Sequence, residues 1–540
     1  MTPEPPARPE PAAATAGQPV PWGLLVAVFT GPFMALLDLS IVTVALPAMQ
    51  TSLHTTFSAL QWVIDGYTLA LSALLLTAGS LGDRYGRKRL YLAGIAVFTV
   101  GSAICAAAPD AGVLIAGRVI QGAAATSLIP GSLSILTQAF PDPARRARMF
   151  GLWGGVGSVG VALGPVVGGV LTEAAGWWAI FLVNLPVGVL AVILGARSIP
   201  ESADPAHAAV DPAGQVTGIA WLGALTFGLI EGGGHGWDTA VTIVPLVLAV
   251  IALAAFLIVE SRSARPMLPL ALFRRPAFAT ANLASFTLGF GAYSVFTFMS
   301  LYLQDVQGYS AISAGLRYLP LCVAIAVMSV LAGRLVSRFG PALSMAVGYG
   351  ITGAALVTMA SFGPVTGYLI IAVVFAFLGA GMGLAITPTT AAAMGSVQRQ
   401  RSGIASGTVN ATRQAGSTLG IAVLGAIITS LAVTRLRSAL TGRRLPGTTA
   451  QHVASATVTA HGAGSPATDA GLAPGLIHEL YGSAFTAGLH VAVIVAGIIT
   501  LLVAALGLVQ LRPVRRRPVA GGVPAPGRQH SAGSARTGGR

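Results

Sequence analysis

Long apolar blocks separated by short polar segments dominate the pattern of this chain. Most blocks are about 20 residues long or longer, the length that a helix needs to cross a bilayer core of ~30 Å. They follow neither the period of an amphipathic helix nor that of a half-buried strand. The pattern predicts about fourteen membrane helices, at residues 22–47, 59–80, 89–108, 112–138, 149–172, 179–198, 214–232, 241–260, 277–304, 311–333, 341–361, 366–390, 403–432 and 483–510.

The basic residues orient these helices, because Lys and Arg favour cytoplasmic loops. With the N-terminus in the cytoplasm, the cytoplasmic loops contain Arg84, Arg87, Lys88, Arg89, Arg145, Arg146, Arg148, Arg262, Arg265, Arg274, Arg275, Arg338, Arg399 and Arg401. The short outer loops carry no Lys or Arg, and the long loop at 434–480 is exempt from the charge rule because of its length. We expect a multi-pass protein of the plasma (inner) membrane with both termini in the cytoplasm.

Composition supports a membrane protein. The chain of 540 residues is 54% hydrophobic and 9% charged, whereas a soluble protein carries roughly 25% charge. The net charge of +14 lies at helix ends and in the C-terminal tail, which indicates topology and no nucleic-acid partner. Cys105 and Cys322 fall inside apolar blocks and suggest helix packing with no disulfide framework.

A short polar stretch at residues 79–89 reads Gly-Ser-Leu-Gly-Asp-Arg-Tyr-Gly-Arg-Lys-Arg. Residues 333–340, which begin 254 positions later (333 − 79), repeat its glycine, leucine, arginine and aromatic positions. Such an echo indicates an internal duplication. Ser337 stands where the first copy has Asp83, so the halves are not equivalent. The alternative, a basic turn between two membrane helices, does not explain the echo.

The first copy resembles the loop signature of the major facilitator superfamily of membrane transporters. Its glycines allow close helix approach and a tight turn, and its acid can bind a helix start or an arginine. From this stretch we expect conformational gating by Gly79, Gly82, Asp83, Arg84, Gly86 and Arg87. The fourteen-helix arrangement looks like the drug:proton antiporter branch. The resemblance implies an all-α major facilitator fold with two six-helix bundles plus two extra central helices.

The position of the echo divides the chain into segments. We expect a disordered cytoplasmic tail at 1–20, an N-terminal bundle at 21–198, a linker with two extra helices at 199–276, a C-terminal bundle at 277–510, and a basic disordered tail at 511–540. Within the second bundle, the Gly, Ala, Thr and Pro content of the outer loop at 434–480 predicts a disordered segment.

Three charged residues lie well inside the predicted membrane helices of the N-terminal bundle: Asp38, Asp65 and Arg118. An ionisable group in the membrane is costly, so it should face a wet cavity or a partner. At 1.5 Å per residue, Asp38 lies ~13 Å and the other two ~9 Å from the outer helix ends, a similar level. Our hypothesis is that Arg118 pairs with one acid and that protonation breaks the pair, because a nearby arginine favours the ionised form and burial the neutral one.

The three charged residues allow other interpretations. The pair can be static and fix only packing, and Asp38 can be a helix-end residue that reaches the headgroups. The stretch at residues 37–47 is similar to the first-helix signature of the fourteen-helix drug exporters, although Ser40 and Thr43 replace the usual Thr and Asn. Residues 117–122 resemble the family's arginine-bearing signature, which is linked to proton transfer.

The helix at 149–172 has glycines every three or four residues and one proline, which makes a flat face that can bend. This resembles a signature that the family's antiporters share. It implies gating by Gly164, Pro165, Gly168 and Gly169, and the alternative is a packing face without a switching role. Arg413 lies near the middle of its helix and needs a carboxylate, a carbonyl or water, so it is either structural or part of coupling.

The chain lacks the phosphate-binding loop G-x-x-x-x-G-K-[ST] and any metal-ligand or nucleophile spacing. We therefore expect no enzyme activity and no cofactor, with the proton gradient as the energy source. The expected activity is export of drugs, antibiotics or other small hydrophobic or cationic compounds by alternating access, in a monomer. The alternatives are an exporter of one metabolite such as an amino acid, siderophore or lipid precursor, a channel or sensor, and a membrane-embedded enzyme.

Overall fold

The computed structural model describes residues 22–140, 142–202, 211–263, 266, 268, 270–397, 402–443, 445–459 and 473–510, and the regular elements in these ranges are helices. The first bundle and the two helices after it contain α1 (Trp22–Leu53), α2 (Phe57–Tyr85), α3 (Arg87–Ala106), α4 (Ala111–Ala139), α5 (Pro143–Ala174), α6 (Ala179–Leu182), α7 (Asn184–Ser198), α8 (Pro212–His235) and α9 (Ala240–Arg262). The second bundle contains α10 (Leu270–Phe273), α11 (Pro276–Leu288), η1 (Gly289–Tyr293), α12 (Ser294–Leu301), η2 (Tyr302–Val306), α13 (Ala311–Arg317), α14 (Leu319–Thr358), η3 (Met359–Ser361), α15 (Tyr368–Gly395), α16 (Ser402–Gly442), α17 (Gly447–Thr459) and α19 (Pro474–Gln510).

Thirteen helical segments of the described residues are long and apolar enough to cross a membrane. They do not include α2, which is 29 residues long and packs along α4. Each of the fourteen segments expected from the sequence corresponds to a helix or to a run of joined helices. The tails at 1–20 and 511–540 lie outside the described residues.

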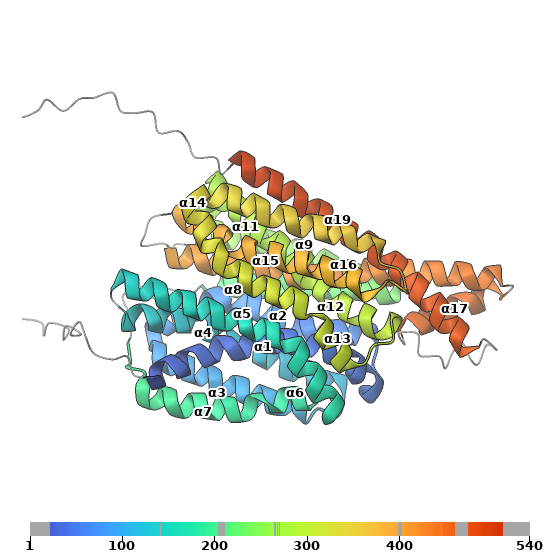
Figure 1. The fold of residues 1–540 in the computed structure, drawn as a ribbon, viewed down its shortest axis with the longest axis horizontal. Coiled ribbons are helices and arrows are strands. Elements are labelled where there is room, and N and C mark those ends of the chain that lie inside the picture. Colours follow the sequence, from blue (N-terminus) through green and yellow to red (C-terminus); the bar gives the residue numbers. More distant parts are fainter. Residues whose placement is uncertain are drawn as a thin grey trace, which may run out of the picture.

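The two bundles lie against each other, with α1–α7 in blue to blue-green and α11–α19 in light green through yellow to red (Figure 1). The internal repeat is visible in the backbone. Gly86 links α2 to α3 with a φ of 108°, and Gly340 breaks α14 into two spans with a φ of 80°. These positions are 254 residues apart (340 − 86), and both use a region of φ that glycine adopts without strain.

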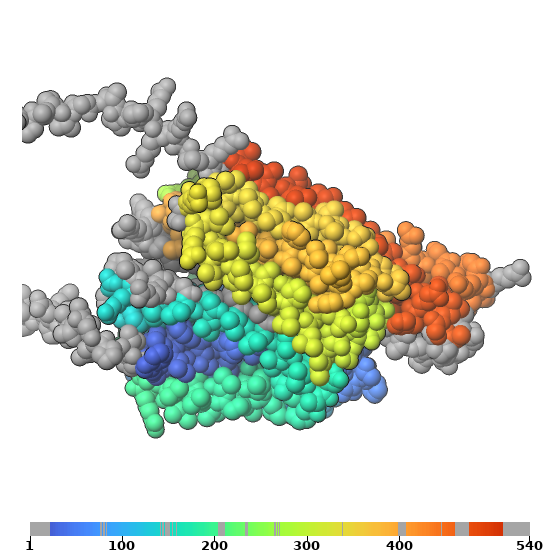
Figure 2. Space-filling view, in the orientation of Figure 1, coloured from blue at the N-terminus to red at the C-terminus, as the bar shows by residue number. Residues whose placement is uncertain are grey.

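The two ends of the molecule differ. We call the end with residues 84–89 the loop end and the opposite end the α17 end, where α17 protrudes at the right in Figures 1 and 2. Among the described residues, the central and α17-end parts of the helices supply the hydrogen bonds between the bundles. For example, Gln304 Nε2 donates to the carbonyl of Val44 at 3.0 Å, and Gln61 Nε2 donates to that of Ile421 at 2.9 Å.

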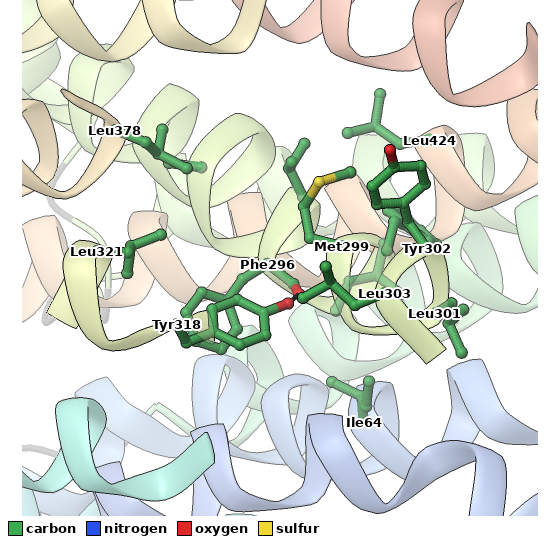
Figure 3. Close-up of a cluster of buried hydrophobic side chains, with 14 of the residues drawn as sticks. Ile64, Phe296, Met299, Leu301, Tyr302, Leu303, Tyr318, Leu321, Leu378 and Leu424 are labelled. Carbon is green, nitrogen blue, oxygen red and sulfur yellow. Dashed lines mark hydrogen bonds between the residues drawn. The ribbon is translucent and has the colours of Figure 1, made fainter. Parts of the chain in front are cut away.

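One apolar core spans both bundles at this level. Ile64 of α2 points from the first bundle toward the aromatic and aliphatic cluster of the second, which includes Leu303, Phe296 and Tyr318 (Figure 3). The rings of Phe296 and Tyr318 lie 4.5 Å apart. This packing holds the bundles together on the α17 side of the candidate site.

The segment at 434–480 differs from the expected disordered loop. Residues 434–442 continue α16, residues 447–459 form α17, and α19 begins before residue 480. Leu436, Leu440 and Val453 are buried in a small core of their own, because apolar residues recur here at helical spacing. The overall Gly, Ala, Thr and Pro content concealed that spacing. Residues 460–472 lie outside the described part.

Candidate functional site

A buried ion pair joins α1 to α4. Asp38 and Arg118 are both fully buried, and Arg118 Nη1 contacts Asp38 Oδ2. The helix α4 begins at Ala111, so Arg118 lies two turns inside it, facing the bundle interior. A buried charge needs both a partner and hydrogen bonds. Of the two acids that the sequence offered, the structure brings Asp38 to the arginine.

Two amide side chains complete the coordination of the carboxylate, and a hydroxyl group in turn accepts hydrogen bonds from both amides. Asp38 Oδ1 accepts hydrogen bonds from Gln121 Nε2 at 3.2 Å and from Asn184 Nδ2 at 3.3 Å. Both amides also donate to Ser102 Oγ, at 2.7 and 3.3 Å respectively. The network thus draws on α1, α3, α4 and α7, so any change in the charge of Asp38 reaches four helices of the first bundle.

Backbone and aromatic groups hold the guanidinium from the other side. Arg118 Nε donates to the carbonyl of Val63 at 3.0 Å, and Nη1 donates to Gln121 Oε1 at 2.9 Å. The guanidinium lies 4.4 Å from the ring centre of Tyr67, in cation–π range. Arg118 therefore keeps several favourable contacts that do not depend on the acid.

Glycines bring these helices close enough for the contacts. A Cβ on Gly122 would overlap the backbone of Tyr67, and a Cβ on Gly101 would lie 2.9 Å from Cγ of Gln121. In both places the added Cβ would lie closer to a neighbouring heavy atom than Cβ atoms do in proteins. The α2–α4 and α3–α4 contacts thus require glycine, and they place Tyr67 and Gln121 beside Arg118.

Asp65 occupies a separate position between the bundles. It is fully buried, its Oδ1 accepts from Thr68 Oγ1 at 3.3 Å, and its Oδ2 has no hydrogen-bond partner. Thr418 of α16 donates to Thr68 Oγ1 at 2.9 Å. A hydrogen-bonded chain therefore runs from Asp65 in the first bundle to the second. A buried polar atom without a hydrogen-bond partner is costly, so Oδ2 singles out Asp65 among the described acids of the first bundle.

A cavity lies between the bundles beside these groups. It is lined by Leu36, Leu39, Ser40, Thr43, Ile64, Val161, Tyr293, Phe296, Thr297, Ile325, Met382, Ser417 and Ile421. The residues come from α1, α2 and α5 on one side and from η1, α12, α14, α15 and α16 on the other. Most are apolar or aromatic, and the polar ones carry hydroxyl groups. The lining is of the kind that contacts apolar molecules, but the accessible volume of about 30 Å³ leaves no room for a drug-sized compound in this conformation.

Arg413 lies apart from the other three predicted charges and is not among the residues that line the cavity, although Tyr293 and Ser417 beside it are. It is half-buried in α16, one turn from Ser417, and its guanidinium lies 6.0 Å from the ring centre of Tyr293. Arg413 Nη2 donates to Asn410 Oδ1. Among the described residues, no carboxylate pairs with it. The structure thus supplies a side-chain amide where the sequence suggested a carboxylate, a backbone carbonyl or water.

The glycine-rich helix α5 contacts both bundles. A Cβ on Gly168 would lie 2.7 Å from the carbonyl oxygen of Ile41, and one on Gly164 would overlap Ser40, so this face packs on α1. A Cβ on Gly169 would lie 2.5 Å from the carbonyl oxygen of Ala311 in the second bundle. Of the predicted gating residues of α5, Gly164 and Gly168 thus pack within the first bundle, and Gly169 lies at the boundary with the second.

The carbonyl of Pro165 belongs to the same boundary. It lies so close to Gly315 of α13 that a Cβ there would overlap it. Two backbones thus meet without an intervening side chain, at the α17 end of both bundles.

The loop between α2 and α3 has a partner that sequence reasoning missed. Glu201, beyond α7, accepts hydrogen bonds from the backbone N–H groups of Lys88 at 3.1 Å and Arg89 at 3.2 Å, at the start of α3. A carboxylate at a helix N-terminus is favourable. The backbone N–H of Arg87 donates to the carbonyl of Ser202 at 2.9 Å. The loop is thereby fixed to the segment that leads out of the first bundle.

The remaining residues of the loop signature have varied surroundings. Gly82 and Gly86 are buried, while Arg84 is exposed and stacks on Tyr85. The surroundings of Gly79 and Asp83 lie outside the described part of the chain.

Three residues of the Asp38 network were not singled out from the sequence. Gln121 follows Arg118 by three residues and so shares its helix face, which was a usable signal. Asn184 lies in an apolar segment, where an amide calls for a partner. Ser102 had no signal, because a serine in a membrane helix usually satisfies itself on its own backbone.

Comparison with known proteins places the chain among transporters. Residues 28–421 match the family described as Major Facilitator Superfamily. Over 429 residues the chain is 37% identical to the multidrug resistance protein Stp of Mycobacterium tuberculosis, covering 79% of this chain and 80% of that protein. It is 37% identical to the methylenomycin A resistance protein of Streptomyces coelicolor, over 76% of this chain and 86% of the relative.

A third relative extends over nearly the whole chain. The tetracenomycin C resistance and export protein of Streptomyces glaucescens is 34% identical, covering 95% of this chain and 96% of that protein. Among solved structures, a bacterial homologue of the human lysosomal transporter Spinster has a TM-score of 0.63 at 18% identity, over 90% of this chain and 97% of that one. The nucleoside transporter NupG has a TM-score of 0.56 at 11% identity, over 86% and 99%. At these identities the two structures support the fold alone.

Proposed function

The chain belongs to the major facilitator superfamily, and we propose that it exports antibiotics or other small, largely apolar compounds in exchange for protons. Membership makes it a membrane transporter and not an enzyme. Relatives that are 34–37% identical bear the names of multidrug resistance and antibiotic export proteins. The largely apolar lining of the small cavity between the bundles suits the same class of cargo once the bundles separate.

The observation that carries proton exchange is Asp65, a fully buried acid with one unpartnered oxygen at the boundary between the bundles. It can hold a proton at Oδ2 in this conformation and release it where water reaches it. A proton that crosses 100 mV supplies ~2.3 kcal/mol, and no cofactor is then required. Thr68 and Thr418 give the protonation state of Asp65 a direct route to the second bundle.

Asp38 and Arg118 form the second element of the proposed mechanism. Their network joins four helices, so a change of partner or protonation at Asp38 alters the packing of the first bundle as a unit. Alternating access then requires that the backbone contacts at the α17 end separate, so that the space between the bundles opens on that side. We propose that the loop end faces the cytoplasm of the plasma membrane and that a monomer is sufficient.

Transport into inverted membrane vesicles tests the proposal. We expect vesicles with the protein to accumulate a fluorescent antibiotic or dye when their interior is acidified, and to lose it when a protonophore collapses the gradient. Asp65→Asn keeps the size of the side chain but cannot carry a proton, so we expect gradient-driven accumulation to fall at least tenfold. The same variant should still bind the compound.

The outcomes separate the alternatives. If the vesicles still accumulate the compound after the protonophore is added, transport is not coupled to protons. If they accumulate none of the dyes and antibiotics in a panel, the result favours an exporter of one metabolite. Asp238→Asn is the matched control, because Asp238 is exposed in the turn between α8 and α9. It should transport like the wild type.

A further inference from the structure

Asp65 lies between two hydrogen bonds that cross from the first bundle to the second. On its α17 side, Gln61 Nε2 donates to the carbonyl of Ile421 at 2.9 Å. On its loop side, Thr418 Oγ1 donates to Thr68 Oγ1 at 2.9 Å. At 1.5 Å per residue, Gln61 is ~6 Å and Thr68 ~4.5 Å from Asp65 along α2. The acid thus has one link between the bundles toward each end of the molecule.

Helical spacing aligns these groups along one contact between α2 and α16. Gln61, Asp65 and Thr68 follow one another at intervals of four and three residues, which places them on one face of α2. Their partners Ile421 and Thr418 are three residues apart on α16. The two helices run in opposite directions, because α2 ends at the loop end and α16 ends beside α17. We call this contact the α2–α16 seam.

A glycine brings the amide of Gln61 close to the backbone of α16. Gln61 is buried, and a Cβ on Gly425 of α16 would overlap its Nε2 atom. The amide therefore lies against bare backbone, with no side chain of Gly425 between them. The hydroxyl residues of the other link, Thr68 and Thr418, have no exposed surface. Both links are therefore closed to solvent in this conformation.

Water has no other evident approach to the acid through the neighbouring helix. Asp65 has no exposed surface, although the exchange of a proton requires contact with water. On another side of α2, α4 packs so closely that a Cβ on Gly122 would overlap the backbone of Tyr67. A proton from solvent therefore reaches Asp65 along the seam, from one end or from the other.

The other ionisable groups in the interior of these helices have partners of their own. Within the described residues, Asp65 accepts a hydrogen bond from Thr68. The other groups pair as follows: Arg118 of α4 with Asp38 of α1, Tyr67 of α2 with the carbonyl of Ala35, Glu231 of α8 with Ser58, and Arg413 of α16 with Asn410.

We propose that the two hydrogen bonds of the seam are separate gates for the proton of Asp65. The Gln61 link closes the path from the α17 end, and the Thr418 link closes the path from the loop end. When one link opens, Oδ2 exchanges a proton with water from that side, while the other link keeps the opposite path closed. Gln61 and Thr418 are then positioning residues, since neither carries the proton. The inference rests on the proposed proton exchange at Asp65 and specifies its two routes.

The reactivity of a thiol at position 65 tests each gate from its own side. Asp65→Cys is combined with Gln61→Leu or with Thr418→Val, which remove one link each and keep roughly the size of the side chain. A membrane-impermeant methanethiosulfonate is added to intact cells, which expose the α17 end, or to inverted vesicles, which expose the loop end. The native cysteines are buried, and protein without the reporter corrects for their labelling.

Each substitution should act from one side only. We expect Gln61→Leu to raise the labelling rate in intact cells roughly fivefold and to leave the rate in inverted vesicles unchanged, because one hydrogen bond of average strength corresponds to such a factor. Thr418→Val should do the reverse. Gln61→Asn has an amide that is one methylene too short to reach Ile421. It should act like Gln61→Leu, and it replaces that variant if leucine prevents folding.

A buried glutamine outside the seam provides the matched control. Gln215 of α8 is buried, and its Nε2 donates to the carbonyl of Ala73 of α2 at 2.7 Å. Gln215→Leu should change neither rate. The inference is overturned if Gln61→Leu or Thr418→Val changes both rates equally or changes neither, or if Gln215→Leu has the same effect as Gln61→Leu.

Failure of the export proposal is seen separately, because the labelling needs neither cargo nor a proton gradient. One-sided labelling in a protein that accumulates nothing in vesicles would retain the two gates and lose the proposed function. Proton-driven accumulation without one-sided labelling would retain the function and contradict the gates.

Discussion

Asp38→Asn should lower the free energy of unfolding by about 3–5 kcal/mol and reduce gradient-driven transport at least 100-fold. The substitution leaves Arg118 buried with no opposite charge, which is the costly way to break a buried ion pair. It also removes the only group of the network that can change its charge. Thermal unfolding in nanodiscs measures the first effect, and vesicle accumulation the second.

The double variant Asp38→Asn with Arg118→Gln distinguishes stability from coupling. With both charges removed, the buried network is neutral, so we expect most of the lost stability to return. Transport should stay absent, because no acid remains at this position. If Asp38→Asn alone had the stability and the transport activity of the wild type, the ion pair would be dispensable. If the double variant regained transport, the ion pair would serve only the packing of the helices.

Gly315→Ala should shift the protein toward a conformation that is open at the α17 end. The added methyl group would overlap the carbonyl of Pro165, at a contact between two backbones that cannot rotate away. The closed α17 end is then disfavoured relative to the open one. A cysteine in place of Ile312, beside this contact, reports the change through its rate of reaction with a membrane-impermeant maleimide. We expect that rate to rise at least fivefold, which corresponds to about 1 kcal/mol.

Gly367→Ala is the matched control. Gly367 lies before α15 near the α17 end, with a φ of −62°, and a Cβ there would meet nothing within 4 Å. The native cysteines Cys105 and Cys322 are buried, and protein without the reporter corrects for their labelling. An unchanged labelling rate in Gly315→Ala, or an equal rise in Gly367→Ala, would show that this boundary does not control access.

The sequence was sufficient for the fold, because its main signals are local. Each apolar block corresponds to a helix or to a run of joined helices in the described residues. The echo between residues 79–89 and 333–340 located the duplication, and Gly86 and Gly340 both have a positive φ at equivalent positions. The segment at 434–480 was interpreted wrongly, since overall composition concealed the helical spacing of Leu436 and Leu440.

The site was only partly predictable. Depth along each helix brought Asp38, Asp65 and Arg118 to one level, but it could not say which acid meets the arginine. That choice depends on rotation of the helices about their axes, which Gly122 and Gly101 fix through tertiary contacts. The acceptor Ser102 and the donor Asn184 come from two further helices and follow from packing alone.

Proton flux in proteoliposomes tests the central claim most directly. The protein is reconstituted with a pH-sensitive dye inside the vesicles, and a cargo gradient is imposed with no initial pH difference. We expect cargo efflux to acidify the interior in the wild type, and Asp65→Asn to abolish the acidification while it still exchanges labelled for unlabelled cargo. Cargo efflux without acidification in the wild type, or undiminished acidification in Asp65→Asn, would contradict the account.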